Sequence, residues 1–177
     1  DEDRARNIVR ILESMNESSA RTIGGDVNTQ DLRIMAMVPL RGASRQCGGR
    51  RLIEYTLERA LESEYITDVL VSTDNSEMAE LAESLGAWAP FIRPPDLSKD
   101  YVSVNEVLKY SIEMVEGLGV FPDLVVLMQE TYPFRTRGCI DSMIERLVRE
   151  GLDSLVPVRA EHRFAWFNHG DEAKQLA

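Results

Sequence analysis

Apolar runs of strand length alternate with amphipathic stretches along most of this chain. The runs of strand length are residues 34–38, 68–74 and 123–129. The first, IMAMV, lacks the period-2 polarity of a half-exposed strand, as expected for a parallel strand covered on both faces. The amphipathic stretches predict helices over residues 52–61, 77–85, 103–116 and 138–149. This alternation indicates βαβ units, and therefore an α/β fold with a mostly parallel central sheet.

Some details of the sheet and of the helix ends can also be predicted. Residues 123–129 are the most apolar run, so we expect them at the centre of the sheet. Residues 87–93 are predicted as a short strand, and residues 154–158 as a last strand that lies at an edge because Pro157 has no N–H. The expected helix-end residues are Asn75 or Asp74 before the second helix, Gly86 after it, and Thr136 before the last helix.

The two ends of the chain differ in pattern from this core. Residues 1–16 carry an apolar stripe of helical spacing behind an acidic start, which predicts a helix. Residues 17–31 are rich in Ser, Gly, Asn and Asp and have no period, as is typical of a linker. We therefore expect an N-terminal helix with a polar linker over residues 1–31, an α/β domain over residues 32–167 and a polar tail over residues 168–177.

Composition narrows the class of protein. A chain of 177 residues that is 44% hydrophobic can bury one sizeable core. Its formal net charge of -10 argues against nucleic acid as a partner, so a phosphate ligand has to be held by locally placed arginines. Cys47 and Cys139 lie far apart and suggest neither a zinc site nor a disulfide framework, which favours a cytoplasmic location. No apolar run approaches the roughly 18 residues of a membrane span, so no membrane partner is expected.

The first apolar run leads into a loop of small and basic residues, RGASR, at residues 41–45. Gly42 allows a ligand to approach the backbone closely, and Arg41 and Arg45 offer planar, permanently charged forks that suit phosphate oxygens. Taken alone, the loop could equally be a surface turn with solvated arginines, because it is neither a GxGxxG nor a Walker motif. The loop therefore indicates a phosphate site only if other parts of the chain support it.

Polar groups also follow the other predicted strands. In an open α/β sheet, ligands bind in the crevice outside the carboxyl ends of the strands, so residues that follow separate strands meet at one edge. The residues at these ends are Thr73, Asp74, Arg93, Gln129, Glu130 and Thr131, with Arg135 just beyond. Basic and amide groups from three strand ends are harder to explain by solvation than one arginine is, which favours the phosphate site.

Four motifs follow one another in order along the predicted domain. They are VPLRGASR at residues 38–45, VSTD at residues 71–74, GA with PFIRP at residues 86–94, and LMQETYPFRT at residues 127–136. These resemble P-x-R-G-G-S-[KR], V-S-T-D, Y-G-A-x-V-P-F-x-R-P and L-L-Q-P-T-S-P-L-R-T of the CMP-sialic acid synthetases, the acylneuraminate cytidylyltransferases. The resemblance covers most of the chain from residue 34 to residue 167.

The resemblance implies a fold, an activity and partners. The fold would be a three-layer nucleotidyltransferase architecture, Rossmann-like and GT-A-like. Members of the family transfer CMP from CTP to the anomeric hydroxyl of a nine-carbon keto-sugar acid and release pyrophosphate, with magnesium present. The reaction is an in-line attack on the α-phosphorus, so catalysis consists largely of positioning and charge neutralisation. A possible homodimer is implied as well.

The same resemblance assigns roles to individual residues. Arg41 and Arg45 would act as catalytic residues on the triphosphate. The residues expected to bind the nucleotide are Gly42, Ser44, Arg93, Ser103 and Gln129. Gln129 has both the donor and the acceptor needed to recognise the edge of a pyrimidine. Arg135 would contact substrate, or else hold its own loop through a carboxylate, and no magnesium ligand is identified.

The chain departs from the family pattern around the phosphate loop and at its end. Between residues 45 and 52 the chain is shorter than the family pattern by roughly half a dozen residues, and the missing residues include a Lys-Asn pair. Glu130 replaces a proline and brings a carboxylate that could ligate a metal, cap a turn or pair with an arginine. The aspartate pair expected for magnesium is not found. Two alternatives therefore stay open: a nucleotide-binding or assembly module with impaired catalysis, and a nucleotidyltransferase for a different sugar.

Overall fold

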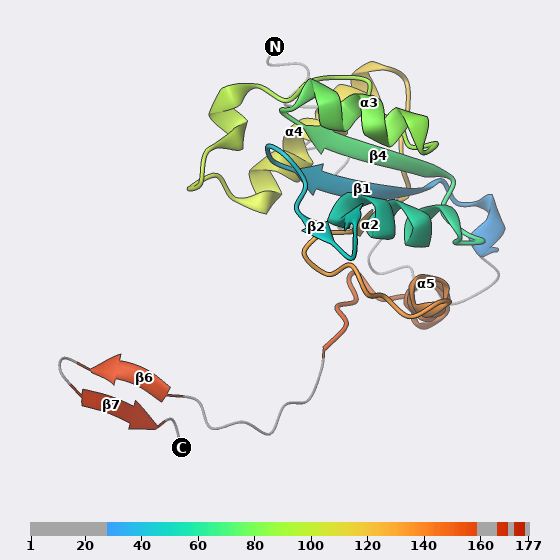
Figure 1. The fold of residues 1–177 in the computed structure, drawn as a ribbon. Helices are drawn as coiled ribbons and strands as arrows, with labels where there is room; N and C mark the ends of the chain where they lie inside the picture. The colour runs from blue at the N-terminus through green and yellow to red at the C-terminus, as the bar shows by residue number, and fades with distance from the viewer. Residues whose placement is uncertain (1–27, 159–165, 170–171, 176–177) are drawn as a thin grey trace, which may run out of the picture.

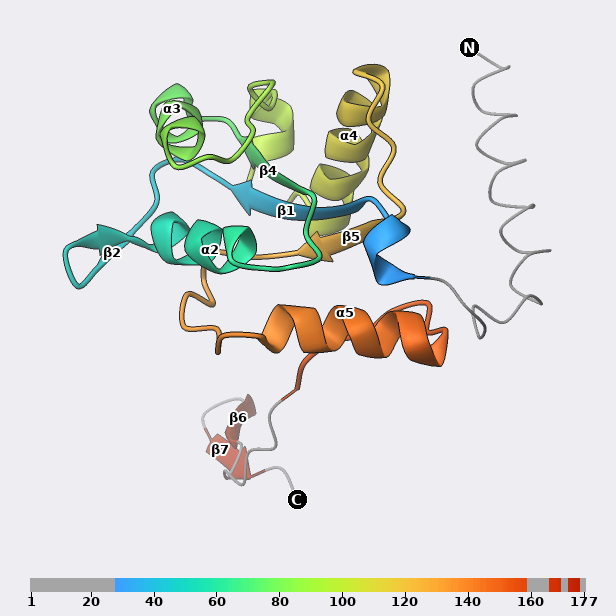
Figure 2. The same ribbon diagram turned by 90° about the vertical axis from the view of Figure 1, so that its right-hand side faces the viewer.

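Three parallel strands form the centre of the computed structural model, which describes residues 28–158, 166–169 and 172–175. Strand β1 (Ile34–Leu40) runs parallel to β4 (Asp68–Thr73), as Figure 1 shows, and lies between β4 and the likewise parallel β5 (Leu124–Leu127), as Figure 2 shows. The predicted parallel sheet is thus confirmed. The predicted helix over residues 1–16 lies outside the described residues, and the predicted domain boundaries stay predictions.

The central strand of this sheet is β1, so the prediction that residues 123–129 occupy the centre is wrong. Residues 34–38 of β1 are completely buried, whereas the β5 side chains are only partly buried and Leu127 keeps 39% of its surface exposed. Apolar composition alone does not distinguish a central strand from the strand beside it, because helices cover both faces of each.

Helices cover both faces of the sheet, as Figure 2 shows. The β1 side chains at positions 36, 38 and 40 pack with α2 (Leu52–Leu61) and α3 (Ser76–Ser84). Those at positions 35 and 37 pack on the opposite face with α4 (Val104–Gly117), and α5 (Cys139–Glu150) adds Ile140 to the first face. This is the predicted three-layer α/β architecture. None of the helices in the described residues is long and apolar enough to cross a membrane.

Several short elements complete the described chain. They are the 3-10 helices η1 (Thr29–Asp31) and η2 (Pro95–Ser98), the antiparallel pair β2 (Gln46–Cys47) and β3 (Arg50–Arg51), and the antiparallel pair β6 (Trp166–His169) and β7 (Glu172–Gln175). The hairpin of β2 and β3 was not predicted. Gly48 and Gly49 form its turn at φ 60° and 80°, a conformation that costs glycine little. Strand β7 and the second half of β6 lie where a polar tail was expected, whereas β6 begins within the last residues of the predicted α/β domain.

Two predicted strands do not form in the described residues. Residues 87–93 make only single bridges, Trp88 with Leu70 and Ile92 with Thr73, because Pro90 between them cannot donate a ladder hydrogen bond. Residues 154–158 pair with no strand in the described part of the chain, and Val156 and Val158 are 72% and 91% exposed. Apolar runs that are this short predict a strand only where a neighbouring strand is available for pairing.

The helix ends follow the predicted chemistry in part. Asn75 caps α3, since its Oδ1 accepts the Met78 N–H at 3.2 Å, and Gly86 follows the helix at φ 92°. Thr136 does not cap α5 with its side chain. The N-cap is Gly138, and Thr136 instead accepts the Cys139 N–H with its backbone carbonyl. The prediction for Thr136 is therefore wrong, because the chain turns at Gly138 in a left-handed conformation that the sequence pattern did not indicate.

Pro39 lies inside β1 instead of ending it. The Met37 carbonyl accepts the Met128 N–H, so odd-numbered β1 residues face β5, and the pairing with β5 ends at Met37. The missing N–H of Pro39 therefore faces a side on which β5 has already left the sheet. On its other side β1 continues beside β4 as far as Leu40. A proline is tolerated in this central strand because no hydrogen bond is lost there.

An ion pair at the start of the sheet predicts a pH dependence of stability. The Arg33 Nε and Nη2 atoms each donate to the Asp68 carboxylate at 2.9 Å, which holds the pKa of Asp68 below its ordinary value. Asp68 therefore stabilises the fold above the ordinary carboxyl pKa of about 4, and this contribution is lost as the pH falls through its lowered pKa. We expect Asp68→Asn to lower the free energy of unfolding at neutral pH, with a difference from wild type that shrinks towards about pH 3.

Urea unfolding of wild type and Asp68→Asn at several pH values measures this difference. The matched control is Asp153→Asn, because Asp153 is exposed. A difference between wild type and Asp68→Asn that stays constant down to about pH 3 would contradict the linkage.

Candidate functional site

The loop of residues 41–45 connects β1 to the hairpin and lies at the carboxyl ends of the strands. Its backbone is held by the end of β4, because the Gly42 N–H donates to Asp74 Oδ1 at 2.7 Å. Gly42 has a φ of 60°, which a residue with a side chain rarely adopts. The geometry confirms that the loop and the end of β4 meet at one edge, as the position of ligand crevices in such sheets predicts.

Ser44 joins three elements through one hydroxyl group. Its Oγ accepts the Ile53 N–H at the start of α2 at 3.0 Å, and its O–H donates to Glu130, which follows β5. The residue is 4% exposed. Ser44 therefore links the loop of residues 41–45 to the N-terminus of α2 and to the end of β5.

Glu130 lies half-buried beside this hydroxyl. Burial raises the pKa of the Glu130 carboxyl, while the Ser44 hydrogen bond and the positive charge of Arg45 lower it by a smaller amount. The sequence left three roles open for Glu130: ligating a metal, capping a turn or pairing with an arginine. In the structure its carboxylate instead accepts a hydrogen bond from the Ser44 hydroxyl of the loop. Glu130 thus belongs to the site, at the base of the loop.

The two arginines of the loop are exposed. Arg41 forms an ion pair with Asp100, and both side chains are largely accessible, at 51% and 90% of their surface. Arg45 is exposed, and its backbone carbonyl accepts the Leu52 N–H at 2.7 Å, which joins it to α2. Two guanidinium groups are therefore placed at the loop without a role in the core, where an anionic ligand can reach them.

Arg93 lies beneath the loop and is 2% exposed. Its Nη1 and Nη2 donate to the carbonyls of Ser72 at 2.8 Å and Leu40 at 3.1 Å, and its Nε donates to Ser98 Oγ at 3.1 Å. Burial lowers the pKa of the guanidinium from its ordinary value. Arg93 therefore ties together the carboxyl ends of β1 and β4, and its predicted contact with the nucleoside stays a prediction.

Ser103 caps α4. Its hydroxyl accepts the Glu106 N–H at 3.3 Å, and the Glu106 carboxylate accepts the Ser103 backbone N–H at 2.9 Å, which forms a capping box; the Ser103 hydroxyl also donates to this carboxylate at 2.8 Å. Hydrogen bonds from Ser103 hold the pKa of Glu106 below its ordinary value. The Arg41–Asp100 ion pair joins the segment ahead of α4 to the loop, whereas the hydroxyl of Ser103 has its partners within α4, and its predicted contact with the nucleotide stays a prediction.

Gln129 and Arg135 form one unit after β5. Arg135 Nη2 donates to the Gln129 carbonyl at 2.8 Å, and Nη1 lies 3.4 Å from Thr56 Oγ1 on α2. Burial lowers the pKa of this guanidinium. Arg135 thus holds its own loop, as one of its two predicted roles requires, but through a carbonyl instead of a carboxylate. The backbone of Gln129 is fixed by this contact.

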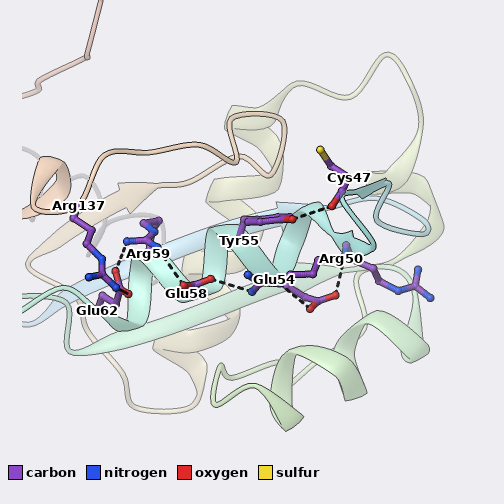
Figure 3. Close-up of polar contacts among 9 residues, drawn as sticks. Cys47, Arg50, Glu54, Tyr55, Glu58, Arg59, Glu62 and Arg137 are labelled. Carbon is purple, nitrogen blue, oxygen red and sulfur yellow. Dashed lines mark hydrogen bonds and ion pairs between the residues drawn. The ribbon is translucent and has the colours of Figure 1, made fainter.

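Charged side chains run along the exposed face of α2, as Figure 3 shows. Arg50 pairs with Glu54 and Glu58, and its guanidinium lies 4.4 Å from the centre of the Tyr55 ring. The Tyr55 hydroxyl donates to the Cys47 carbonyl at 2.9 Å and so attaches the hairpin to the helix. Arg50 therefore contacts α2 and not the loop of residues 41–45.

A hollow of about 410 Å³ lies at the other end of α2, towards the start of α5. Acidic and basic side chains share its lining, among them Arg59, Glu62, Arg137 and Asp141. None of the residues predicted for the site lies there. We therefore place the candidate site at the loop, where the strand ends meet, and not in this hollow.

The described residues do not form a metal site by themselves. No group of three or more His, Cys, Asp or Glu side chains within the described ranges is arranged to hold an ion. Asp74 and Glu130 each contact the loop from a different strand end.

Sequence reasoning found the loop but missed the carboxylates that hold it. Asp74 and Asp100 were not among the predicted site residues, although Asp74 was recognised at the end of a strand. A signal was available for Asp74, because a carboxylate directly after a strand faces the N–H groups of the neighbouring loop. No sequence pattern indicated Asp100.

Comparison with known proteins identifies similar chains. The family described as Cytidylyltransferase matches residues 44–165. The pseudaminic acid cytidylyltransferase of Campylobacter jejuni subsp. jejuni is 29% identical over 126 residues, which are 67% of this chain and 54% of the relative. The CMP-N,N'-diacetyllegionaminic acid synthase of Legionella pneumophila is 32% identical over 122 residues, which are 64% of this chain and 53% of the relative. The chain thus spans about half the length of these two curated relatives.

One solved structure supports the fold. A CMP:2-keto-3-deoxy-manno-octonic acid synthetase, solved in complex with CTP, superposes with a TM-score of 0.50 at 19% identity. The superposition covers 65% of this chain and 47% of that one. At this identity the likeness shows a shared α/β nucleotidyltransferase fold and nothing further.

Proposed function

We propose, from the premise that this chain belongs to the cytidylyltransferase family, that it transfers CMP from CTP to the anomeric hydroxyl of a nine-carbon keto-sugar acid. The observation that carries this proposal is the loop of residues 41–45 at the carboxyl ends of the strands, with an N–H, a hydroxyl and two exposed guanidinium groups. These are the donor types that bind phosphate oxygens.

The proposed reaction forms one bond and breaks one bond at phosphorus. The anomeric oxygen of the acceptor attacks the α-phosphorus of CTP, the bond from that phosphorus to the bridging oxygen breaks, pyrophosphate leaves and the hydroxyl proton passes to water. Arg41 and Arg45 would neutralise charge on the departing pyrophosphate, and Gly42 and Ser44 would position the phosphates. Gln129, whose backbone Arg135 fixes, would recognise the cytosine edge.

Some parts of this proposal rest on resemblance alone. We propose magnesium as an ion that arrives with the phosphates, and no step above is routed through it. The reaction with CTP supports a cytoplasmic location. A homodimer, which light scattering at several concentrations would reveal, is proposed on the same basis.

The acceptor class is supported by the relatives. Those named above act, by their names, on pseudaminic acid and N,N'-diacetyllegionaminic acid, and an N-acylneuraminate cytidylyltransferase of Escherichia coli is 32% identical over 111 residues, 58% of this chain and 25% of that protein. These acceptors are all nonulosonic acids. Pyrophosphate release from CTP with each of the three acids in turn would identify the acceptor.

Base selectivity tests the proposed function. We expect CTP to bind at least about tenfold more tightly than UTP, because a uracil edge leaves a donor or acceptor of the site unpaired. Calorimetry with CTP, UTP and ATP measures this ratio. The matched variant Gln129→Leu keeps the volume of the side chain but removes its amide, and it should bring the CTP and UTP affinities together. Equal affinity of the wild type for all three nucleotides would remove the cytidylyltransferase proposal.

A further inference from the structure

Acidic side chains of the protein contact the anion-binding groups of the phosphate loop. The Gly42 N–H donates to Asp74, the Ser44 hydroxyl donates to Glu130, and the Arg41 guanidinium pairs with Asp100. Each carboxylate therefore lies where a phosphate oxygen would be expected to bind. Asp100 is 90% exposed and can move away at little cost, whereas Glu130 is half-buried.

Among the three carboxylates, Glu130 matters most for phosphate binding, because it occupies the hydroxyl of Ser44. A serine hydroxyl has one proton to donate and two lone pairs that accept. Ser44 accepts the Ile53 N–H and donates its single proton to Glu130, and the side chain is 4% exposed. While this hydrogen bond exists, Ser44 has no donor left for a phosphate.

The surroundings of Glu130 hold it in this position. The positive charge of Arg45 attracts the Glu130 carboxylate. The N-terminus of α2 is also close, because the Ile53 N–H donates to Ser44 there. Arg51 lies 3.5 Å from the Ser44 carbonyl, and Arg135 binds the carbonyl of Gln129, the residue before Glu130. A carboxylate at a helix N-terminus among arginines is electrostatically favourable, as a bound phosphate would be.

We propose that the Glu130 carboxylate is a built-in competitor of the nucleotide: it occupies the Ser44 hydroxyl in the free protein and has to leave it before a triphosphate binds. The inference rests on the proposed function, which supplies the triphosphate ligand. The position is a proline in the motif that this segment resembles, so the competition is a property of this chain. Glu130 thereby acts as a positioning residue, which sets the affinity of the loop through Ser44.

A pH dependence follows from the same geometry. An ionised Glu130 repels a triphosphate and retains Ser44, whereas a protonated Glu130 does not repel it. Triphosphate affinity should therefore fall as the pH rises through the pKa of Glu130, which burial has raised. The phosphates titrate as well, but they titrate equally for every variant, so the difference between variants isolates Glu130.

Calorimetry with inorganic tripolyphosphate tests the proposal without involving the base. Glu130→Gln keeps an acceptor for the Ser44 proton but removes the charge, and we expect it to bind tripolyphosphate about tenfold more tightly than wild type at about pH 8. This gain should shrink as the pH falls through the pKa of Glu130, which burial has raised. Glu130→Asp shortens the side chain away from Ser44 but keeps the charge, so its gain should be smaller and should retain the pH dependence. Glu80→Gln, on the exposed side of α3, is the control for net charge.

Each outcome bears on the proposal in one direction. Equal or weaker binding by Glu130→Gln at about pH 8, a gain that does not change with pH, or an equal gain from Glu80→Gln would overturn it. If neither wild type nor Glu130→Gln binds tripolyphosphate, the phosphate site is misplaced and the proposed function fails with it. If tripolyphosphate behaves as expected but CTP shows no advantage over UTP, the proposed function fails and the competition at Ser44 stands.

Discussion

Replacing Arg41 by lysine is expected to slow CMP-sugar formation by about 10²-fold without loss of the fold. Arg41 directly follows β1 and precedes Gly42, and its side chain is 51% exposed and forms an ion pair with the exposed Asp100. The core does not depend on it. Its planar fork can bind two phosphate oxygens at once, which matters most when negative charge develops on the departing pyrophosphate. Lysine keeps the charge but loses this geometry.

Steady-state kinetics of pyrophosphate release measures the effect, after unfolding curves have shown that each variant is folded. Arg41→Ala should be slower still, and Arg45→Lys should be less affected because Arg45 lies one residue beyond Ser44. Asp100→Asn is the matched control, since it removes the partner of Arg41 without touching the fork. If Arg41→Ala releases pyrophosphate as fast as wild type, the phosphate site is not at this loop.

Replacing Arg93 by alanine is expected to destabilise the protein by about 3 kcal/mol or more. The guanidinium is 2% exposed and donates to the carbonyls of Ser72 and Leu40. Alanine leaves both carbonyls without this partner, each at a cost of about 1–3 kcal/mol, and it also leaves a cavity under the loop. The ends of β1 and β4 would then lose the group that holds them together.

Urea denaturation with a constant m-value measures this loss. Ser98→Ala removes only the contact to Nε and should cost much less, which makes it the matched control. Arg93→Lys should recover part of the stability, because an ammonium can still reach one carbonyl. Unchanged stability of Arg93→Ala together with weakened CTP binding would instead support the role in nucleotide binding that the sequence predicted.

The sequence predicted those features that depend on local pattern. Helical spacing located α2, α3, α4 and α5 to within one or two residues, and the apolar runs located the three sheet strands. The order of the strands could not be predicted from apolar content, because the most apolar run is β5, which lies beside the central strand β1. The hairpin of β2 and β3 was missed because two strands of two residues carry no detectable period.

The candidate site was predictable by residue type and position, but not by partner. The basic loop and the strand ends do meet, as the rule for open α/β sheets predicts. Arg41 and Arg93 look alike in sequence, yet one is exposed at the loop and the other is buried beneath it. Burial depends on what packs around a side chain, and the partners of Arg93 are spread over β1, β4 and η2. The carboxylate of Glu130 was noticed, whereas its contact with Ser44 needed the three-dimensional structure.

Pro39 limits how far the ladder between β1 and β5 can extend. A parallel ladder continues as long as the backbone N–H and C=O groups of one strand find partners on the neighbouring strand. On the side of β5, the residue after Met37 that would continue this ladder is Pro39, which has no hydrogen to offer. This position coincides with the end of the β1–β5 pairing, and Gln129 directly follows Met128, whose N–H makes the last hydrogen bond to β1. A single imino acid in the central strand thus prevents the ladder with β5 from continuing towards the loop of residues 41–45, while the pairing with β4 continues to Leu40.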